Sequence, residues 1–259
     1  MSLPAAAFVT DMGPTPAFED DAYTRALGAL GKSLRPKAVI VMSPHWLTRG
    51  GVAVTASSHP ETIHDYGGFP QEMYRKNYPC AGSPALAADV VGRLTAAGIP
   101  AKEEPKRGLD HAAWVPLSRL FPDASVPVVQ LSSPAGDPRM AEAAGTALAP
   151  LSEEGVLLLA SGTLVHNLSL LKFGEKDAAE DGWARDFDSW VAERLSPGRR
   201  NELGSYMTAP GAERAVPTPE HFETLFFALG AAAESPAAAT YRDVVYGNGV
   251  RRLVIFRPE

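Results

Sequence analysis

Five of the six histidines in this chain fall where loops are expected to follow strands or where a helix is expected to begin. Asp11 follows the first expected strand, and the five histidines are His45, His64, His111, His166 and His221. Several imidazoles and a carboxylate, with no cysteine ligand, suit a divalent first-row metal. Two histidines, one carboxylate and open positions form the facial arrangement of non-haem Fe(II) oxygenases, and Zn²⁺ accepts the same ligands with water in its fourth position.

The same residues also have a purely structural interpretation. His45 would then pack against Trp46, and the other histidines would be unrelated, hydrogen-bonded residues at loop edges. Asp11 would cap its own turn, as aspartate often does before glycine and proline. Ionisable clusters at strand ends favour function only statistically, so both interpretations stay open at this point.

The elements that must position these residues are strands alternating with helices. The apolar run 38–42, AVIVM, is too short for a helix and rich in Val and Ile, which predicts a fully buried strand ending just before His45. Further strands are expected at 6–10, 51–56, 126–132, 155–162 and 250–256. Helices are expected at 19–32, 84–98, 114–121, 138–148 and 183–195, and from 217 to Gly230 with Thr218 as N-cap.

This alternation predicts an α/β fold, with residues 1–259 as a single catalytic domain built on one mixed sheet flanked by helices. In open α/β sheets the ligand crevice lies at the carboxyl ends of the strands, where most of these polar residues are expected. The irregular segment 59–84 is long and aromatic, which favours a packed functional loop.

Composition limits the possible partners. The net charge of -6 gives no basic surface, so we expect no nucleic acid partner. We also expect no membrane association, because no apolar stretch reaches membrane-spanning length and the N-terminus lacks a signal pattern. The one cysteine, Cys80, fits a reducing compartment and therefore a cytoplasmic location. Nucleotide-binding glycine motifs and a serine nucleophile elbow are not found in the sequence.

Six segments, taken in chain order, carry a resemblance to a known family. They are RPKAVIVMSPHW, TIHDYGGFPQEMY, LDHAAWVPL, VPVVQLS, LLLASGTLVHNL and PTPEHF. Together they resemble the class III extradiol ring-cleavage dioxygenases, and the branch they resemble most is that of the DOPA-4,5-dioxygenase-like proteins. The resemblance runs from the first expected strand to the last.

The resemblance implies an oxidoreductase that uses Fe(II) to insert O₂ into a small aromatic substrate, a catecholic or 2-aminophenolic ring. The ring opens next to, but outside, the two hydroxyls and gives a semialdehyde. By this resemblance His45 and His221 bind the metal, and His166 is the acid/base histidine. His111 would be a second catalytic histidine lining the pocket. The implied substrate-binding residues of the lid loop are His64, Tyr66 and Phe69.

One position departs from the family pattern. The first strand of the family normally ends in a ligating histidine followed by Gly-Ser-Pro, whereas this chain has Asp11 at that place. Asp11 could supply the carboxylate of a two-histidine, one-carboxylate site. It could also change the chemistry to another metal-dependent reaction. A third alternative is a non-catalytic metal-binding or protein-binding relative.

Two further expectations concern recognition. Residues that contact the ring substituent and determine substrate specificity are expected in the long loop and in the region 200–216. Exposed loop aromatics favour a homodimer.

Overall fold

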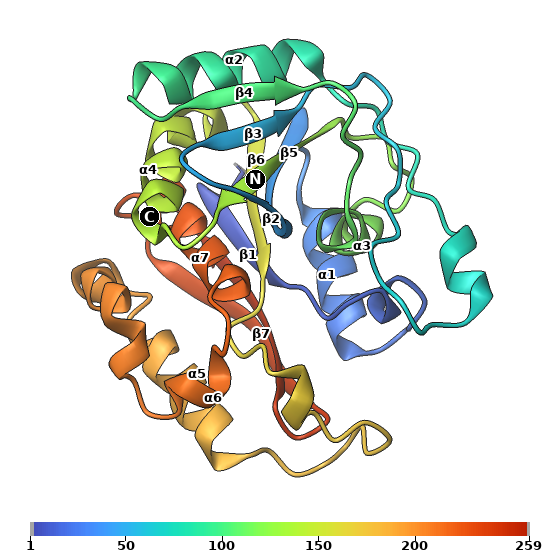
Figure 1. Ribbon diagram of the computed structural model, residues 1–259, viewed down its shortest axis with the longest axis vertical. Coiled ribbons are helices and arrows are strands. Elements are labelled where there is room, and N and C mark those ends of the chain that lie inside the picture. The colour runs from blue at the N-terminus through green and yellow to red at the C-terminus, as the bar shows by residue number, and fades with distance from the viewer. Residues whose placement is uncertain (1–2, 258–259) are drawn as a thin grey trace.

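Eight strands form one mixed sheet in the computed structural model, which describes residues 3–257 (Figure 1). The spatial order is β4-β3-β5-β2-β6-β1-β8-β7. The strands are β1 (Ala6–Thr10), β2 (Ala38–Thr48), β3 (Val52–Thr55), β4 (Ala101–Glu104), β5 (Val128–Pro134), β6 (Val156–Gly162), β7 (Ala237–Val245) and β8 (Gly249–Phe256). The three central strands β2, β6 and β1 run parallel, so their carboxyl ends meet at one edge of the sheet.

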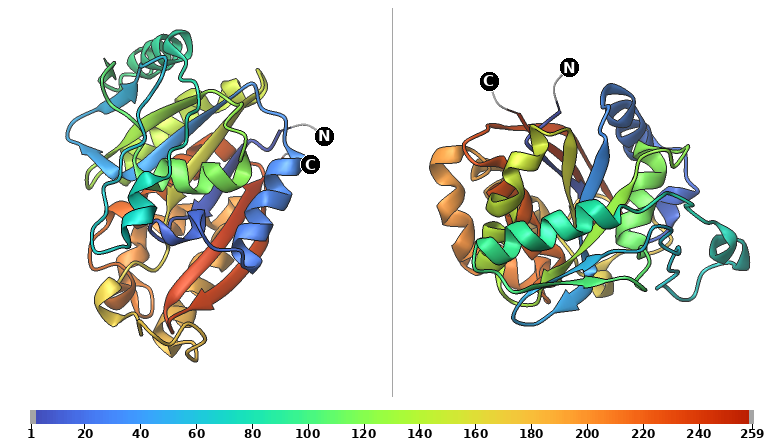
Figure 2. Two further views of the ribbon diagram at one scale, coloured as in Figure 1. Left: turned by 90° about the vertical axis from the view of Figure 1, so that its right-hand side faces the viewer. Right: turned by 90° about the horizontal axis from the view of Figure 1, so that it is seen from above.

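Helices cover both faces of this sheet, as Figures 1 and 2 show. One face packs against α2, α4 and α7, while α1 and α3 lie on the other. The helices are α1 (Ala22–Ser33), α2 (Pro84–Ala96), α3 (His111–Leu120), α4 (Pro138–Leu148), α5 (Gly182–Glu193), α6 (Ala212–Ala215) and α7 (Glu220–Ala232). The predicted fold class is therefore confirmed.

Burial on both faces explains why the central strands read as continuous apolar runs. In β2, Ile40 and Met42 belong to the core beneath α4 and α7, whereas Val39 and Val41 belong to the core beneath α1 and α3. Successive side chains of a strand point to opposite faces, so a strand covered on both sides needs apolar residues at every position. The same alternation holds for Leu157 and Leu158 of β6.

The carboxyl end of β2 is irregular, and this irregularity presents His45. The strand does not stop before His45, as the sequence suggested, but continues to Thr48. Its pairing with β5 shifts between Ser43, opposite Ser132, and Leu47, opposite Ser133. The three intervening residues 44–46 bulge out of the ladder, and bulges of this kind commonly re-aim a side chain beside an active site.

Two helix predictions need correction. The third helix begins at His111 rather than near residue 114, because the Asp110 side chain caps it by accepting from the Ala113 amide. The helix expected to stop at Gly230 continues to Ala232. Gly230 does not end this helix; an added Cβ there would lie 1.9 Å from the Glu142 carbonyl oxygen, so glycine allows close packing on α4.

The N-terminus of α7 and two strands also differ from the predictions. The N-cap is Pro219 rather than Thr218, whose hydroxyl instead donates to Glu220. Strands β4 and β7 were not predicted. β4 is short and charged, and both strands are edges of the sheet, so neither shows the apolar run of a central strand. Among the described residues, no helix is long and apolar enough to cross a membrane.

Gly162 should be essential for seating α7 on the sheet. An added Cβ would lie 2.1 Å from Thr224 Oγ1 and 2.3 Å from the His221 carbonyl oxygen. Because the α7 backbone would have to move, we expect Gly162→Ala to cost about 1–3 kcal/mol of unfolding free energy. The melting temperature should fall by roughly 2–4 °C for each kcal/mol lost.

Gly92→Ala on α2 is the matched control for thermal unfolding, because an added Cβ there has no neighbour within 4 Å. Alanine at this exposed helical position should raise stability by about 0.5–1 kcal/mol. Equal melting temperatures for Gly162→Ala and the unsubstituted protein would show that α7 does not depend on this contact.

Candidate active site

The central strands bring the predicted polar residues to one place. Asp11 directly follows β1, and its amide donates to the Gly162 carbonyl at the end of β6 at 2.8 Å. The Thr163 hydroxyl in turn donates to the Asp11 carbonyl at 2.6 Å. The Thr163 amide donates to the His221 carbonyl at 3.1 Å, which ties the start of α7 to the same edge. The backbone of this edge is therefore fixed by hydrogen bonds between three elements.

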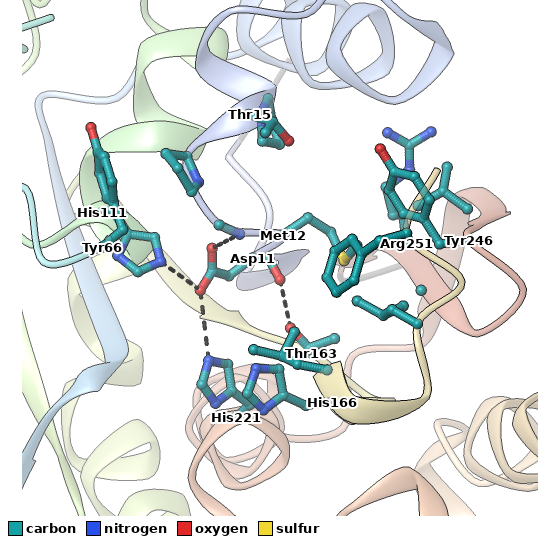
Figure 3. A pocket seen from close by; sticks show the side chains of 18 of the residues that line it. Asp11, Met12, Thr15, Tyr66, His111, Thr163, His166, His221, Tyr246 and Arg251 are labelled. Atoms are coloured by element: carbon teal, nitrogen blue, oxygen red, sulfur yellow. Dashed lines mark hydrogen bonds and ion pairs between the residues drawn. The ribbon is translucent and has the colours of Figure 1, made fainter. Parts of the chain in front are cut away.

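The two oxygens of the Asp11 carboxylate have different partners. Oδ1 accepts from the Gly13 amide at 3.1 Å, which is the turn-capping contact expected of aspartate before glycine. Oδ2 faces three imidazoles, as Figure 3 shows for His111 and His221. The turn-capping and cluster interpretations of Asp11 are thus compatible, because each uses a different oxygen.

The Nε2 atoms of three histidines surround Asp11 Oδ2. His45 Nε2 lies 3.5 Å from this oxygen, and the Nε2 atoms of His111 and His221 each lie 3.7 Å from it. His45 Nε2 and His221 Nε2 are 3.2 Å apart. Asp11, His111 and His221 are buried, whereas the His45 side chain is 25% exposed.

These spacings can be tested against a metal ion. Two ligand atoms bound at about 2.1 Å lie about 3.0 Å apart at a right angle and about 3.4 Å apart at the tetrahedral angle. The separations among Asp11, His45 and His221, from 3.2 to 3.7 Å, are close to those values. Asp11 and His45 also form a compact group with His111. The donor set therefore fits a divalent ion.

Carboxylates behind the histidines orient them for this role. Asp65 accepts from two of them: its Oδ2 lies 3.0 Å from His45 Nδ1 and its Oδ1 lies 2.9 Å from His111 Nδ1. Glu220 Oε1 lies 3.2 Å from His221 Nδ1. A carboxylate on Nδ1 fixes the tautomer that leaves the Nε2 lone pair free for a metal.

The same contacts set the protonation of the cluster. Burial opposes charge on His111, but Asp11 and Asp65 outweigh it and raise the pKa of this histidine to about 9. The hydrogen bond with His221 lowers the pKa of Glu220 to about 2. Burial raises the pKa of Asp65, yet the hydrogen bonds from His111 and His45 hold it well below its usual range.

His166 lies in a second compact group with Glu220 and His221, whose ligand atoms are within 4.8 Å of one another. Its ring stacks on that of His221 with centroids 3.6 Å apart and planes 15° apart. Its Nδ1 is buried and has no hydrogen-bond partner among the described residues. Burial, together with neighbouring His221, lowers the pKa of His166 to about 4. His166 is therefore a neutral imidazole with one ring nitrogen unpaired.

A cavity of about 500 Å³ opens beside the cluster. Asp11, His45, His111, His166 and His221 all line it, and so do Tyr66 and Phe69 of the long loop. This size lies within the usual range for pockets that bind small molecules. Asp11 and four of the five histidines singled out from the sequence thus line one cavity.

His64 is the predicted residue that the structure does not bring to the cavity. Its Nε2 instead lies 2.8 Å from the Lys76 carbonyl oxygen, and its ring packs edge-on against Tyr66 and Trp114. The next residue, Asp65, enters the site in its place. Side-chain direction in an irregular loop follows no period, so sequence spacing could not separate these neighbours.

The region 200–216, expected to read the substrate, contributes no residue to the lining. The wall far from the histidines instead comes from segments 168–176 and 245–251. The sequence reasoning also missed Asp65 and Glu220. Asp65 directly follows His64, and Glu220 directly precedes His221. This position next to a predicted site histidine was the available sequence signal.

The fold and the site together define an α/β protein with a histidine-rich and carboxylate-rich active-site cavity at the carboxyl ends of its central strands. The family model described as the catalytic LigB subunit of aromatic ring-opening dioxygenase matches residues 14–252. The chain belongs to this family. The predicted family and the predicted class of oxidoreductase enzyme are confirmed at this level, while Asp11 lies just outside the matched residues.

Individual relatives agree with this assignment. The chain is 41% identical to a 4,5-DOPA dioxygenase extradiol of Escherichia coli strain K12 over 87% of this chain and 84% of the relative. It is 40% identical to a protein of the same name from Beta vulgaris over 80% of this chain and 77% of that one. The crystal structure of an uncharacterized Escherichia coli K12 protein superposes with a TM-score of 0.82 at 34% identity, covering 97% and 98% of the two chains.

Asp65→Asn should weaken metal binding without unfolding the protein. An amide cannot accept from both His45 Nδ1 and His111 Nδ1 with the two oxygens that Asp65 uses. Loss of such a contact behind a ligand typically lowers metal affinity about 10–100-fold. Calorimetric titration with Zn²⁺ measures the change. Asp123→Asn, in an exposed turn, is the control, and equal affinities for the two variants would contradict an orienting role for Asp65.

Proposed function

We propose that this protein is a non-haem, metal-dependent extradiol dioxygenase that opens a catecholic or 2-aminophenolic ring to a semialdehyde. The observation that carries the proposal is the convergence of Asp11 Oδ2, His45 Nε2 and His221 Nε2 within 3.2 to 3.7 Å beside a substrate-sized cavity. Membership of the ring-opening dioxygenase family and relatives named for extradiol DOPA cleavage support it.

In this proposal Asp11, His45 and His221 bind the metal as one carboxylate and two imidazoles. The expected ion in the active enzyme is Fe(II), and Zn²⁺ would occupy the same ligands. Bound Fe(II) would supply the electron transfer that lets O₂ react with an electron-rich ring. Asp65 and Glu220 keep two ligand rings oriented by accepting from their Nδ1 atoms.

The other cavity residues act on the substrate. His166 would accept a proton from a ring hydroxyl and return it later, because it is the cavity histidine whose Nδ1 has no partner among the described residues. His111 lines the same cavity, with its Nε2 3.7 Å from Asp11 Oδ2, where it would contact the ring or the oxygen-derived group. Tyr66 and Phe69, whose rings pack edge-on at 5.6 Å, would wall the aromatic substrate.

A second candidate function is metal-dependent chemistry other than ring cleavage. The observation that favours it is Asp11 itself, because a carboxylate in place of imidazole lowers the charge of the site by one. A non-catalytic role has less support, since a scaffold has no use for an unpaired imidazole beside a substrate-sized cavity. We infer a cytoplasmic location from the single, buried cysteine Cys80, and a homodimer remains a prediction.

The direct test is turnover after anaerobic purification and loading with Fe(II). A catechol panel should give yellow ring-opened products with one O₂ consumed per ring. Oxygen uptake without a ring-opened product would favour the second candidate function. Stoichiometric metal binding with neither oxygen uptake nor product would favour the non-catalytic one.

His166→Ala should separate acid/base catalysis from metal binding. Removal of a positioned general acid/base typically slows turnover about 10²–10⁴-fold. Bound metal, measured by elemental analysis, should stay near the level of the unsubstituted protein because His166 is not one of the three proposed ligands. Loss of metal in this variant would instead place His166 among the ligands.

Variants of Asp11 separate ligation from turn capping. Asparagine can still accept from the Gly13 amide but is a poor metal ligand, whereas histidine restores the ligand type usual in the family. We expect Asp11→Ala and Asp11→Asn to lose most bound metal and Asp11→His to retain it. Full metal occupancy at unchanged affinity in Asp11→Asn would mean that Asp11 is a turn residue only.

A further inference from the structure

The cavity has a second end, away from the histidines, where apolar side chains lie beside paired charged ones. Figure 3 shows Tyr246 and Arg251 on the side of Asp11 opposite His111 and Tyr66. Leu168 and Phe173 line the cavity and are 58% and 69% exposed, unusually high for such side chains. The Phe173 ring lies 5.8 Å from that of Tyr246. Exposed apolar side chains gathered at a cavity mark a surface that binds an apolar group.

The cations at this end are already paired with carboxylates. Lys176 Nζ lies 3.0 Å from Glu19 and 3.5 Å from Asp21. Arg251 Nη1 lies 2.6 Å from Asp21, and the same guanidinium makes two hydrogen bonds to Asp243. Of these five residues, Glu19, Lys176 and Arg251 line the cavity, whereas Asp21 and Asp243 pair with the two cations from outside the lining. Each of the two cations therefore already has carboxylate partners before an anionic substrate approaches.

We propose that this distal end selects aromatic substrates whose ring substituent is uncharged and apolar, and that it disfavours a substituent carrying a carboxylate. The inference rests on the proposed ring-cleaving function and names the substrate class of that site. Such a substituent differs from the amino-acid side chain of DOPA, the compound in the names of the extradiol relatives.

The physical reason is the balance between burial and desolvation. An apolar substituent against Leu168, Phe173 and Tyr246 gains about 25 cal/mol for each Å² removed from water. A carboxylate in the same place loses hydration, and its electrostatic partner would have to come from Lys176 or Arg251, which already have carboxylate partners. The Glu19 carboxylate, which lines the cavity beside Lys176, adds repulsion.

Dihydrocaffeate and its methyl ester test the proposal, because they share ring and chain length and differ in charge. Binding to the Zn²⁺-loaded protein is measured by anaerobic calorimetry, and turnover is measured with Fe(II). The ester should bind at least about tenfold more tightly than the acid. Equal binding, or tighter binding of the acid, would overturn the proposal.

Glu19→Gln tests the role of the paired charges. This change frees Lys176 from one carboxylate partner, so that Lys176 can pair with the carboxylate of the acid. The ratio of ester affinity to acid affinity should therefore fall about threefold to tenfold. Glu154→Gln is the matched control, since it breaks a comparable Arg93–Glu154 pair of 2.8 Å that is outside the cavity lining. An unchanged ester-to-acid ratio in Glu19→Gln would overturn the role given to these charges.

Phe173→Ser tests the apolar wall and should weaken binding of the ester about fivefold while changing binding of unsubstituted catechol little. Met207→Ser is the control at another exposed apolar residue, 50% exposed and outside the lining. The calorimetric readout is independent of turnover. A clear ester preference without ring opening would refute the proposed function and leave only the binding preference of the distal end standing. Ring opening without ester preference would overturn this inference and leave the proposed function standing.

Discussion

The candidate site depends on the Asp11 carboxylate, which belongs at once to the backbone and to the histidine cluster. Oδ1 accepts from the Gly13 amide, while Oδ2 lies within 3.7 Å of three imidazole Nε2 atoms. The first contact fixes the direction of the second, because a carboxylate held through one oxygen can rotate little. Asp65 and Glu220 hold the Nδ1 sides of the same three imidazoles. These carboxylate contacts therefore fix the orientation of the whole cluster.

Much of the fold could be predicted because buried parallel strands leave a strong pattern. The runs that became β2 and β6 are apolar at every position, and their polar successors fall at one sheet edge. Terminal and edge features were less predictable. Thr218 resembles a cap, but Pro219 occupies that position, and Gly230 resembles a helix end although it is a packing contact with α4. A local hydrogen bond from Thr218 to Glu220 accompanies the first difference, and tertiary packing on α4 explains the second.

Much of the candidate site could also be predicted, because most of its residues follow or begin the elements that leave this strong pattern. Asp11 and four histidines follow from strand ends and helix starts, which topology brings together. Asp65 could not be distinguished from His64 because an irregular loop gives no side-chain direction. The cavity wall far from the histidines lies in segments 168–176 and 245–251, whose apolar residues have no period that marks a cavity. These parts of the site depend on long-range packing rather than on local sequence.

The central claim is that Asp11, His45 and His221 hold one metal ion. Anomalous X-ray diffraction from crystals grown with Zn²⁺, collected on both sides of the zinc absorption edge, tests it most directly. The account predicts a single strong peak about 2.0–2.2 Å from Asp11 Oδ2, His45 Nε2 and His221 Nε2. A peak bound by His111 in place of His221, or one that leaves Asp11 outside bonding distance, would contradict it.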